Sequence, residues 1–214
     1  MLFSISAFFQ IIWRVQLCYC LWLIKHLFSF KIIEAVAHFM LVHASNKCAH
    51  NLIFNRDFQT TLTSGIGDDS GGLLSYDPSN NQTTVLLRNL TVPSGVAVSR
   101  DGSFLLVGEY SANRIRRVWL KGPKANSSDL FMLLAGRPDN IKRNSRGQFW
   151  IAVNSVLGCS TLSSGVRVTE NGIVLQTVSL VEEYGAEVAS EVQEYNGTLY
   201  GGSLLASYAI IFTP

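Results

Sequence analysis

The 214-residue sequence predicts an all-β fold, a partial β-propeller of about three four-stranded blades that follows an apolar N-terminal segment. Matching residues recur at a spacing of 45 residues, which is typical of propeller blades built from two hairpins each. A β-sandwich also alternates strands and turns but gives no reason for equal spacing. Three pairs share this spacing: Pro93 and Pro138, Gly102 and Gly147, and Phe104 and Phe149.

The expected strands occupy residues 54–214 and come in pairs around turn signals. "GVAVS" and "FLLVGEY" flank Arg100-Asp101-Gly102, and "NIKRN" and "FWIAV" flank Ser145-Arg146-Gly147. The strands of the first hairpin in each repeat are apolar on both faces, as expected when each blade packs against its two neighbouring blades. The other expected strands are "GGLLSYDP" and "TTVLL", "IRRVWL" and "DLFMLL", "GVRVT" and "IVLQTVSL", "SEVQEY" and "TLYGGSL", and a last strand "SYAIIF".

This set amounts to three blades plus one strand, whereas most closed propellers have four to eight blades. A partial propeller leaves apolar blade faces uncovered. We therefore expect either that blades are missing from this chain or that its exposed blade faces self-associate.

Residues 1–50 form a separate apolar segment in which Arg14 interrupts two apolar runs. Neither run reaches the roughly 18 residues of a membrane span. Three interpretations stay open: a signal peptide or anchor ending near Ala35-Val36-Ala37, membrane association through residues 1–33, or a mispredicted gene start outside the fold. The first predicts the secretory pathway, with a vacuolar or extracellular destination or a membrane anchor.

Charge and reactive residues exclude several kinds of chemistry from the repeat region. The net charge is +2, and because residues 1–53 hold four basic side chains against one acidic, the remainder is close to neutral. A nucleic-acid surface is therefore not expected. All four histidines lie at or before His50, and Cys159 is the single cysteine after Leu52. The repeats alone cannot build a Ser-His-Asp triad, a Cys-His nucleophile or a Cys/His zinc site.

Long motifs closely resemble the plant strictosidine synthase-like family. They are "GGLLSYDPSNNQTTVLLRNLTVPSGVAVSRDGSFLLVGEYSANRIRRVWLKGPKA", "GRPDNIKRNSRGQFWIAVN" and "SEVQEYNGTLYGGSL". The resemblance covers about residues 54–214 and implies the C-terminal half of a six-bladed propeller. It also implies a small-molecule ligand in the central channel.

Strictosidine synthase itself joins the amine tryptamine to the aldehyde secologanin in alkaloid biosynthesis. The resemblance places the family's catalytic glutamate at Ser190 and a nearby family histidine at Val188. A serine hydroxyl does not titrate near neutral pH and cannot replace a carboxylate that moves protons. We therefore expect this chain to lack the condensing activity. A non-catalytic binding module is the alternative that this residue favours.

A wider superfamily of propellers contains calcium-dependent esterases and lactonases, and Asp139-Asn140-Ile141 resembles one of their ligand pairs. The matching position of the previous blade is Ser94-Gly95. Calcium needs six or more oxygen ligands, so we favour a turn-capping role for Asp139 and Asn140 and expect no cofactor. A calcium-dependent hydrolase stays the alternative. The channel candidates are Ser94, Asp139, Asn140 and Ser190.

Four Asn-X-Ser/Thr sequences, more than the roughly two expected by chance, lie in or beside predicted turns. They predict a glycoprotein of the secretory pathway, because glycans are accepted in surface loops. The asparagines are Asn81, Asn89, Asn126 and Asn196.

Overall fold

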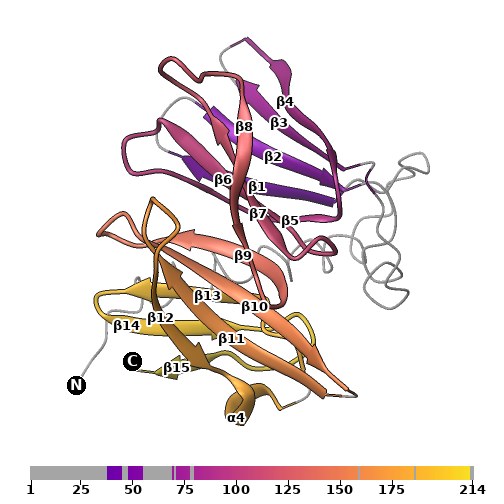
Figure 1. The fold of residues 1–214 in the computed structure, drawn as a ribbon, viewed down its shortest axis with the longest axis vertical. Helices are drawn as coiled ribbons and strands as arrows, with labels where there is room; N and C mark the ends of the chain where they lie inside the picture. The colour runs from indigo at the N-terminus through magenta and orange to yellow at the C-terminus, as the bar shows by residue number, and fades with distance from the viewer. Residues whose placement is uncertain are drawn as a thin grey trace. The chain divides into compact units, whose positions relative to one another are not determined.

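The computed structural model describes residues 38–44, 48–54, 69, 71–77, 80–158, 160–185 and 187–212 (Figure 1). These residues form antiparallel sheets and one short helix, so the all-β prediction is confirmed. Most of the apolar segment predicted at residues 1–50 lies outside the described residues. Among those described, no helix is long and apolar enough to cross a membrane.

The first sheet has the order β1-β2-β3-β4 and begins earlier than the sequence predicted. Its strands are β1 (His38–Ala44), β2 (Cys48–Phe54), β3 (Gly71–Asp77) and β4 (Gln82–Leu90). β1 and β2 precede the expected start of the strands, and β2 pairs with β3 through partners such as His50 and Ser75. Pairing supplies backbone hydrogen bonds to an otherwise open edge of β3, which no local hydropathy pattern reveals.

The second and third sheets repeat one topology, each strand pairing with the next along the chain. The first strands of both sheets end in a turn whose glycine has positive φ, 69° at Gly102 and 88° at Gly147. The prediction of equivalent hairpins 45 residues apart is thus confirmed. The strands are β5 (Pro93–Val98), β6 (Phe104–Glu109), β7 (Arg114–Trp119) and β8 (Ser128–Leu133), then β9 (Arg137–Arg143), β10 (Phe149–Leu157), β11 (Ser160–Val168) and β12 (Val174–Ser179).

The last sheet holds three strands: β13 (Glu191–Tyr195), β14 (Thr198–Gly202) and β15 (Ile210–Phe212). A single-turn helix, α4 (Val181–Tyr184), precedes it. The described chain therefore contains three four-stranded sheets and one three-stranded sheet, where the sequence predicted three blades and one strand.

Each pair of neighbouring sheets encloses its own apolar core, because the second strand of a sheet is apolar on both faces. In β6, Phe104 faces the core shared with the third sheet, and Leu105 faces the core shared with the first. In β10, Phe149 joins Phe104, whereas Trp150 joins Val192 of the last sheet. Packing of this kind is what the sequence predicted for successive blades.

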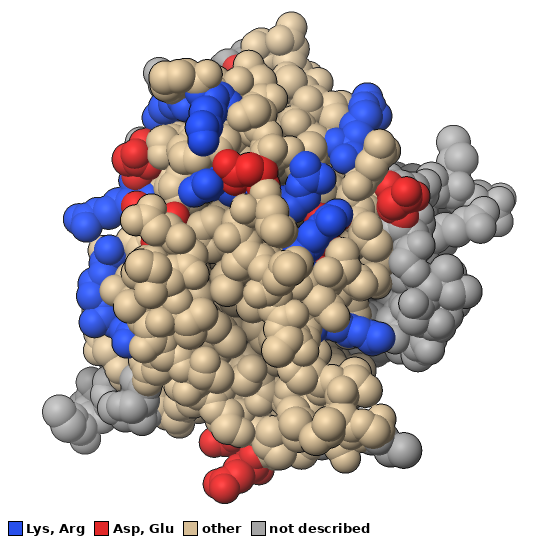
Figure 2. Space-filling view, in the orientation of Figure 1, with Lys and Arg blue, Asp and Glu red and all other residues tan. Residues whose placement is uncertain are grey.

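Charged side chains of both signs are interspersed on the face drawn in Figure 2. The basic run of β7 is divided among separate partners: Arg114 pairs with Glu109, Arg116 donates to Ser128, and Arg117 pairs with Asp129. The run is therefore a strand with paired cations rather than a basic patch.

Candidate functional site

The first strands of the second and third sheets, β5 and β9, carry matching bulges. In β9, Ile141 pairs with Ile151 and Pro138 with Val153, so that Asp139 and Asn140 together oppose one residue of β10. The same irregularity occurs in β5, where Ser94 and Gly95 lie between two paired positions. A bulge of this kind bends its strand and redirects its side chains. The structure thus places the candidates of two blades at equivalent points.

Close approach of β5 to β9 depends on glycine. A Cβ atom added to Gly95 would lie 2.5 Å from the backbone nitrogen of Ile141 and 2.7 Å from the carbonyl oxygen of Asp139. Ser94 uses its hydroxyl in the same contact, with its Oγ 2.9 Å from the carbonyl oxygen of Pro138 and 3.3 Å from that of Asp139. Ser94 therefore joins two blades.

Ser190 lies directly before β13 and joins the third sheet to the last. Its carbonyl oxygen accepts hydrogen bonds from the backbone nitrogen of Asn140 at 3.1 Å and from Asn140 Nδ2 at 2.8 Å. Its Oγ accepts from the backbone nitrogen of Leu204 at 3.0 Å. Ser94, Asp139, Asn140 and Ser190 are all buried, with at most 6% of each exposed. The four channel candidates thus form one chain of contacts across three sheets.

Asp139 is the titratable member of this group. Burial raises the pKa of its carboxyl to about 8, and the negative charge of Glu191 adds to the shift. Hydrogen bonds from the Ser190 hydroxyl and the Asn140 backbone N–H oppose it. At neutral pH the carboxyl is therefore mostly protonated.

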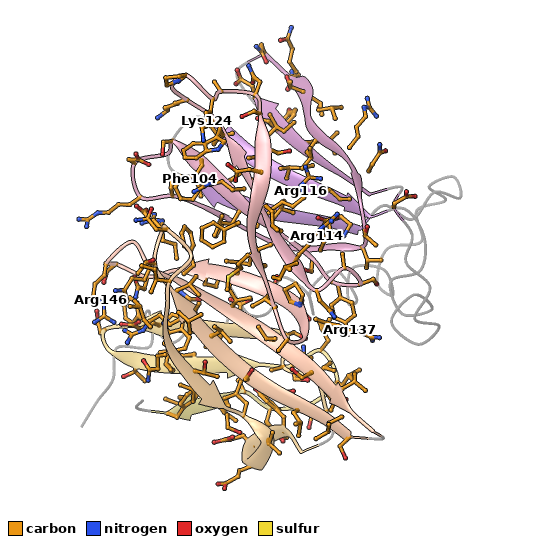
Figure 3. All side chains as sticks on the ribbon, in the orientation of Figure 1. Phe104, Arg114, Arg116, Lys124, Arg137 and Arg146 are labelled. Atoms are coloured by element: carbon orange, nitrogen blue, oxygen red, sulfur yellow. The ribbon has the colours of Figure 1, made fainter. Side chains whose placement is uncertain are left out.

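Two further pairs border Asp139, and the sequence analysis did not identify either. Lys142 Nζ lies 3.0 Å from Glu191 Oε1, which ties β9 to β13. Arg137, labelled in Figure 3 at the start of β9, lies over the ring of Tyr110 at 5.5 Å, and burial raises the pKa of Tyr110. The partners in each pair come from different sheets, so no local motif signals them.

The oxygen atoms at the bulge do not suffice for a calcium shell. Asn140 Oδ1 is buried without a hydrogen-bond partner and, with the Asp139 carboxyl, offers two ligand groups. The hydroxyls of Ser94 and Ser190 are already engaged. Calcium takes six to eight oxygens, and the described residues include no cluster of three His, Cys, Asp or Glu side chains suited to a metal. These residues therefore do not fit calcium.

The four sequon asparagines share one backbone feature. Asn81, Asn89, Asn126 and Asn196 are exposed and have φ between 50° and 66°. Asparagine tolerates this left-handed region better than most other side chains, so the backbone conformation alone accounts for its presence at these positions.

Sequence comparisons match this chain to one plant family. A family model described as strictosidine synthase matches residues 49–123. The chain is 45% identical over 154 residues to strictosidine synthase-like protein 12 of Arabidopsis thaliana, covering 71% of this chain and 46% of that protein. It is 42% identical over 144 residues to strictosidine synthase of Catharanthus roseus, covering 65% and 41%. The chain thus spans about half the length of the curated relatives it matches.

Solved structures show the same fold at low identity. A luciferin-regenerating enzyme superposes with a TM-score of 0.57 at 15% identity, over 73% of this chain and 50% of that one. A gluconolactonase from Xanthomonas campestris gives a TM-score of 0.52 at 14% identity, over 76% and 53%. These likenesses support a partial propeller and concern the fold alone.

Proposed function

Because the chain belongs to the strictosidine synthase-like family, we propose that its inner strands form one side of a small-molecule site without condensing activity of their own. The observation that carries this proposal is Ser190. It occupies the position that the family resemblance assigns to the catalytic glutamate, and it is buried at the junction of β9 and β13.

The chemistry of condensation explains why Ser190 matters. Closing the new ring requires a base that takes a proton from the amine or from the ring carbon. A positioned acid or base typically contributes a factor of about 10² to 10⁴. The Ser190 hydroxyl does not titrate near neutral pH and already accepts a hydrogen bond from Leu204. The neighbouring Glu191 is held by Lys142.

The 214 residues span about half the length of the curated relatives. Tested by itself, this stretch would hold a ligand from fewer sides than a closed propeller does. Loose placement reduces rate, because much of an enzyme's advantage comes from orienting the reacting groups.

A product assay with tryptamine and secologanin separates these two causes. The proteins are the 214-residue chain, its Ser190→Glu variant, and versions of each extended with the N-terminal half of the Catharanthus relative. We expect product only from the extended Ser190→Glu protein, and none from an extended Ser190→Ala control. Circular dichroism of each protein checks that it is folded.

Two results would contradict the proposal. Turnover by the unmodified chain at about 1 s⁻¹ or faster, a rate ordinary for enzymes, would show that neither cause holds. Turnover by the extended protein with Ser190 unchanged would show that the glutamate is dispensable and that coverage alone was limiting.

The same preparations test the hydrolase alternative with p-nitrophenyl acetate and γ-butyrolactone, in calcium and in EDTA. We expect no calcium-dependent hydrolysis. Calcium-dependent turnover that is lost in Asn140→Ala would replace the present proposal with a lactonase or esterase function.

We also propose that the protein passes through the secretory pathway toward the vacuole or the cell exterior. All four sequon asparagines are exposed, so a glycosyltransferase can reach them. Expression in plant cells followed by glycosidase treatment should shift the electrophoretic mobility, whereas a fourfold Asn→Gln variant should not shift. An untreated mobility equal to that of the variant, together with cytosolic fractionation, would reject this routing.

A further inference from the structure

The last strand of each sheet forms an open edge, and β12 is the edge with the least protection. Among the described residues, β12 pairs only with β11. Natural sheets usually block such edges with charges, with proline or by keeping the strand short. β4 carries Arg88, β8 carries Asp129 and β15 has three residues, whereas the β12 sequence VLQTVS contains no charge and no proline. β12 is therefore able to pair with a further strand.

Exposed apolar side chains gather at the beginning of β12. Ile173 is 62% exposed, Val174 51% and Leu175 43%. The face drawn in Figure 2 shows no charged side chain over most of the area where Figure 1 draws β11 and β12. Burial of apolar surface contributes about 25 cal/mol for each Å² removed from water. A partner that covers this end of β12 therefore gains from hydrophobic burial as well as from backbone pairing.

The backbone of β12 also has hydrogen-bonding groups that point away from β11. The backbone nitrogen of Leu180 donates to the carbonyl oxygen of Ser163 at 2.9 Å. Inward and outward groups alternate along an antiparallel strand, so Val178 also turns its backbone groups toward β11. The N–H and C=O groups of Thr177 and Ser179 then face outward. A strand laid along this edge can therefore bond to both residues.

We propose that β12 pairs with β12 of a second copy of this chain, antiparallel and around a two-fold axis at Thr177. This axis sets Thr177 opposite Thr177, and Val178 of each copy opposite Gln176 of the other. A two-fold contact presents the same surface twice, so a charged edge would repel its own copy. β12 carries no charge and avoids that repulsion, which favours a second copy over a charged partner strand.

The paired edge is short, which limits the strength of this contact. The register with β11 is regular from Gln176 to Ser179 and shifts at a bulge before Gln176. We expect the six-residue strands to bury less than the ~800 Å² per partner of a standard interface. The dissociation constant should accordingly be about 1–100 µM. β12 is the strand farthest from β9 in its sheet, so the contact does not depend on the proposed small-molecule site.

Sedimentation equilibrium of the full 214-residue chain, from about 1 to about 300 µM, measures this association. We expect monomer at the lowest concentration and dimer at the highest. Thr177→Lys and Thr177→Glu should each weaken dimerisation by about tenfold or more, because like charges meet at the axis. An equimolar mixture of the two variants should recover the dimer, because opposite charges then meet. Circular dichroism checks that each variant is folded.

Leu130→Lys is the matched control, because Leu130 is also an exposed apolar residue on the last strand of a sheet, β8. It should dimerise as the unmodified chain does. Hydrogen exchange gives a second measurement of the contact. The amides of Thr177 and Ser179 should exchange about tenfold more slowly at high than at low protein concentration, whereas those of β8 should not change.

Four outcomes would overturn the proposal. A monomer at every concentration would show that this edge does not pair with itself. A dimer that both Thr177 variants leave unchanged would place the contact elsewhere, for example on the exposed blade faces. Folded variants that stay monomeric when mixed would show that Thr177 does not lie at the axis. Equal weakening by Leu130→Lys would show a general effect of added charge.

Discussion

The bulges of β5 and β9 have the same backbone register but opposite surroundings. In β5 the bulge residues are Ser94 and Gly95, and the Ser94 hydroxyl is used on the carbonyls of the next blade. In β9 they are Asp139 and Asn140, which keep a carboxyl with a raised pKa and an amide oxygen without a donor. The β5 bulge packs against the next blade, whereas the β9 bulge keeps polar groups whose hydrogen-bonding capacity is not fully used.

This difference shows how a repeat can hold a site in one copy only. The spacing fixes where a bulge forms, and the two residues inside it determine its role. Small side chains allow the next strand to approach, as at Gly95 against Ile141. Larger polar side chains there retain unmet bonding capacity, which is a common property of functional positions.

The largest expected effect comes from Gly95→Ala, which breaks the packing bulge. Its Cβ atom would lie 2.5 Å from a backbone nitrogen and 2.6 Å from a Cα atom of β9, so the two inner strands must separate. We expect a loss of about 3 kcal/mol or more in the free energy of unfolding, measured in urea. Gly72→Ala is the control, because its added Cβ meets only ordinary contacts from 3.6 Å. Equal losses in both variants would show that β5 does not depend on close approach.

Asp139→Asn tests the polar bulge of β9 through the pH dependence of the free energy of unfolding. The folded-state pKa of Asp139 is about 8 and its ordinary value is 3.8, so between these values the native chain holds more protons than the unfolded chain. The stability that the protonated carboxyl provides is complete below pH 4 and is lost as the pH rises toward 8. Relative to the variant, the unmodified chain should therefore lose a few kcal/mol between pH 4 and pH 8. Urea unfolding of both proteins across this range measures the difference, and parallel curves would contradict the raised pKa.

Ser94→Ala should have a smaller effect. It removes the hydroxyl that bonds to the buried Pro138 carbonyl and leaves that oxygen without this donor. We expect a loss of about 1–2 kcal/mol in the free energy of unfolding. Ser94→Cys, which keeps a weak donor of similar shape, should lose less. An alanine variant as stable as the unmodified chain would show that the hydroxyl contributes nothing net.

The smallest expected difference is between the turns of the two blades, and it tests whether these blades are equivalent outside the bulges. Gly102 and Gly147 have positive φ in matching turns, and neither would bring an added Cβ closer than 3.2 Å to another atom. Alanine at either position should cost about 1–2 kcal/mol, because the left-handed conformation disfavours a Cβ atom. Thermal unfolding of the two variants should give similar shifts. A large difference would mean that the 45-residue equivalence does not extend to the turns.

Much of the fold was readable from local residues. The turns around Gly102 and Gly147 and the apolar residues on both faces of the second strands predicted the hairpins and their stacking, and the structure confirms both. These features depend on steric preferences and side-chain hydropathy within a few residues. The pairing of β1 and β2 with β3 was missed, because it depends on partners distant in sequence.

The candidate site likewise has features that the sequence predicted and features that only the structure shows. The resemblance of the sequence to known propeller families named Ser94, Asp139, Asn140 and Ser190 as channel candidates. Only the tertiary structure decided that the Ser94 hydroxyl donates to a backbone carbonyl, whereas Asn140 Oδ1 has no donor. It also set the pKa of Asp139, through burial and through Glu191 on another sheet. The physical reason is that spacing follows from short-range geometry, whereas hydrogen bonding and ionisation depend on groups that only folding brings together.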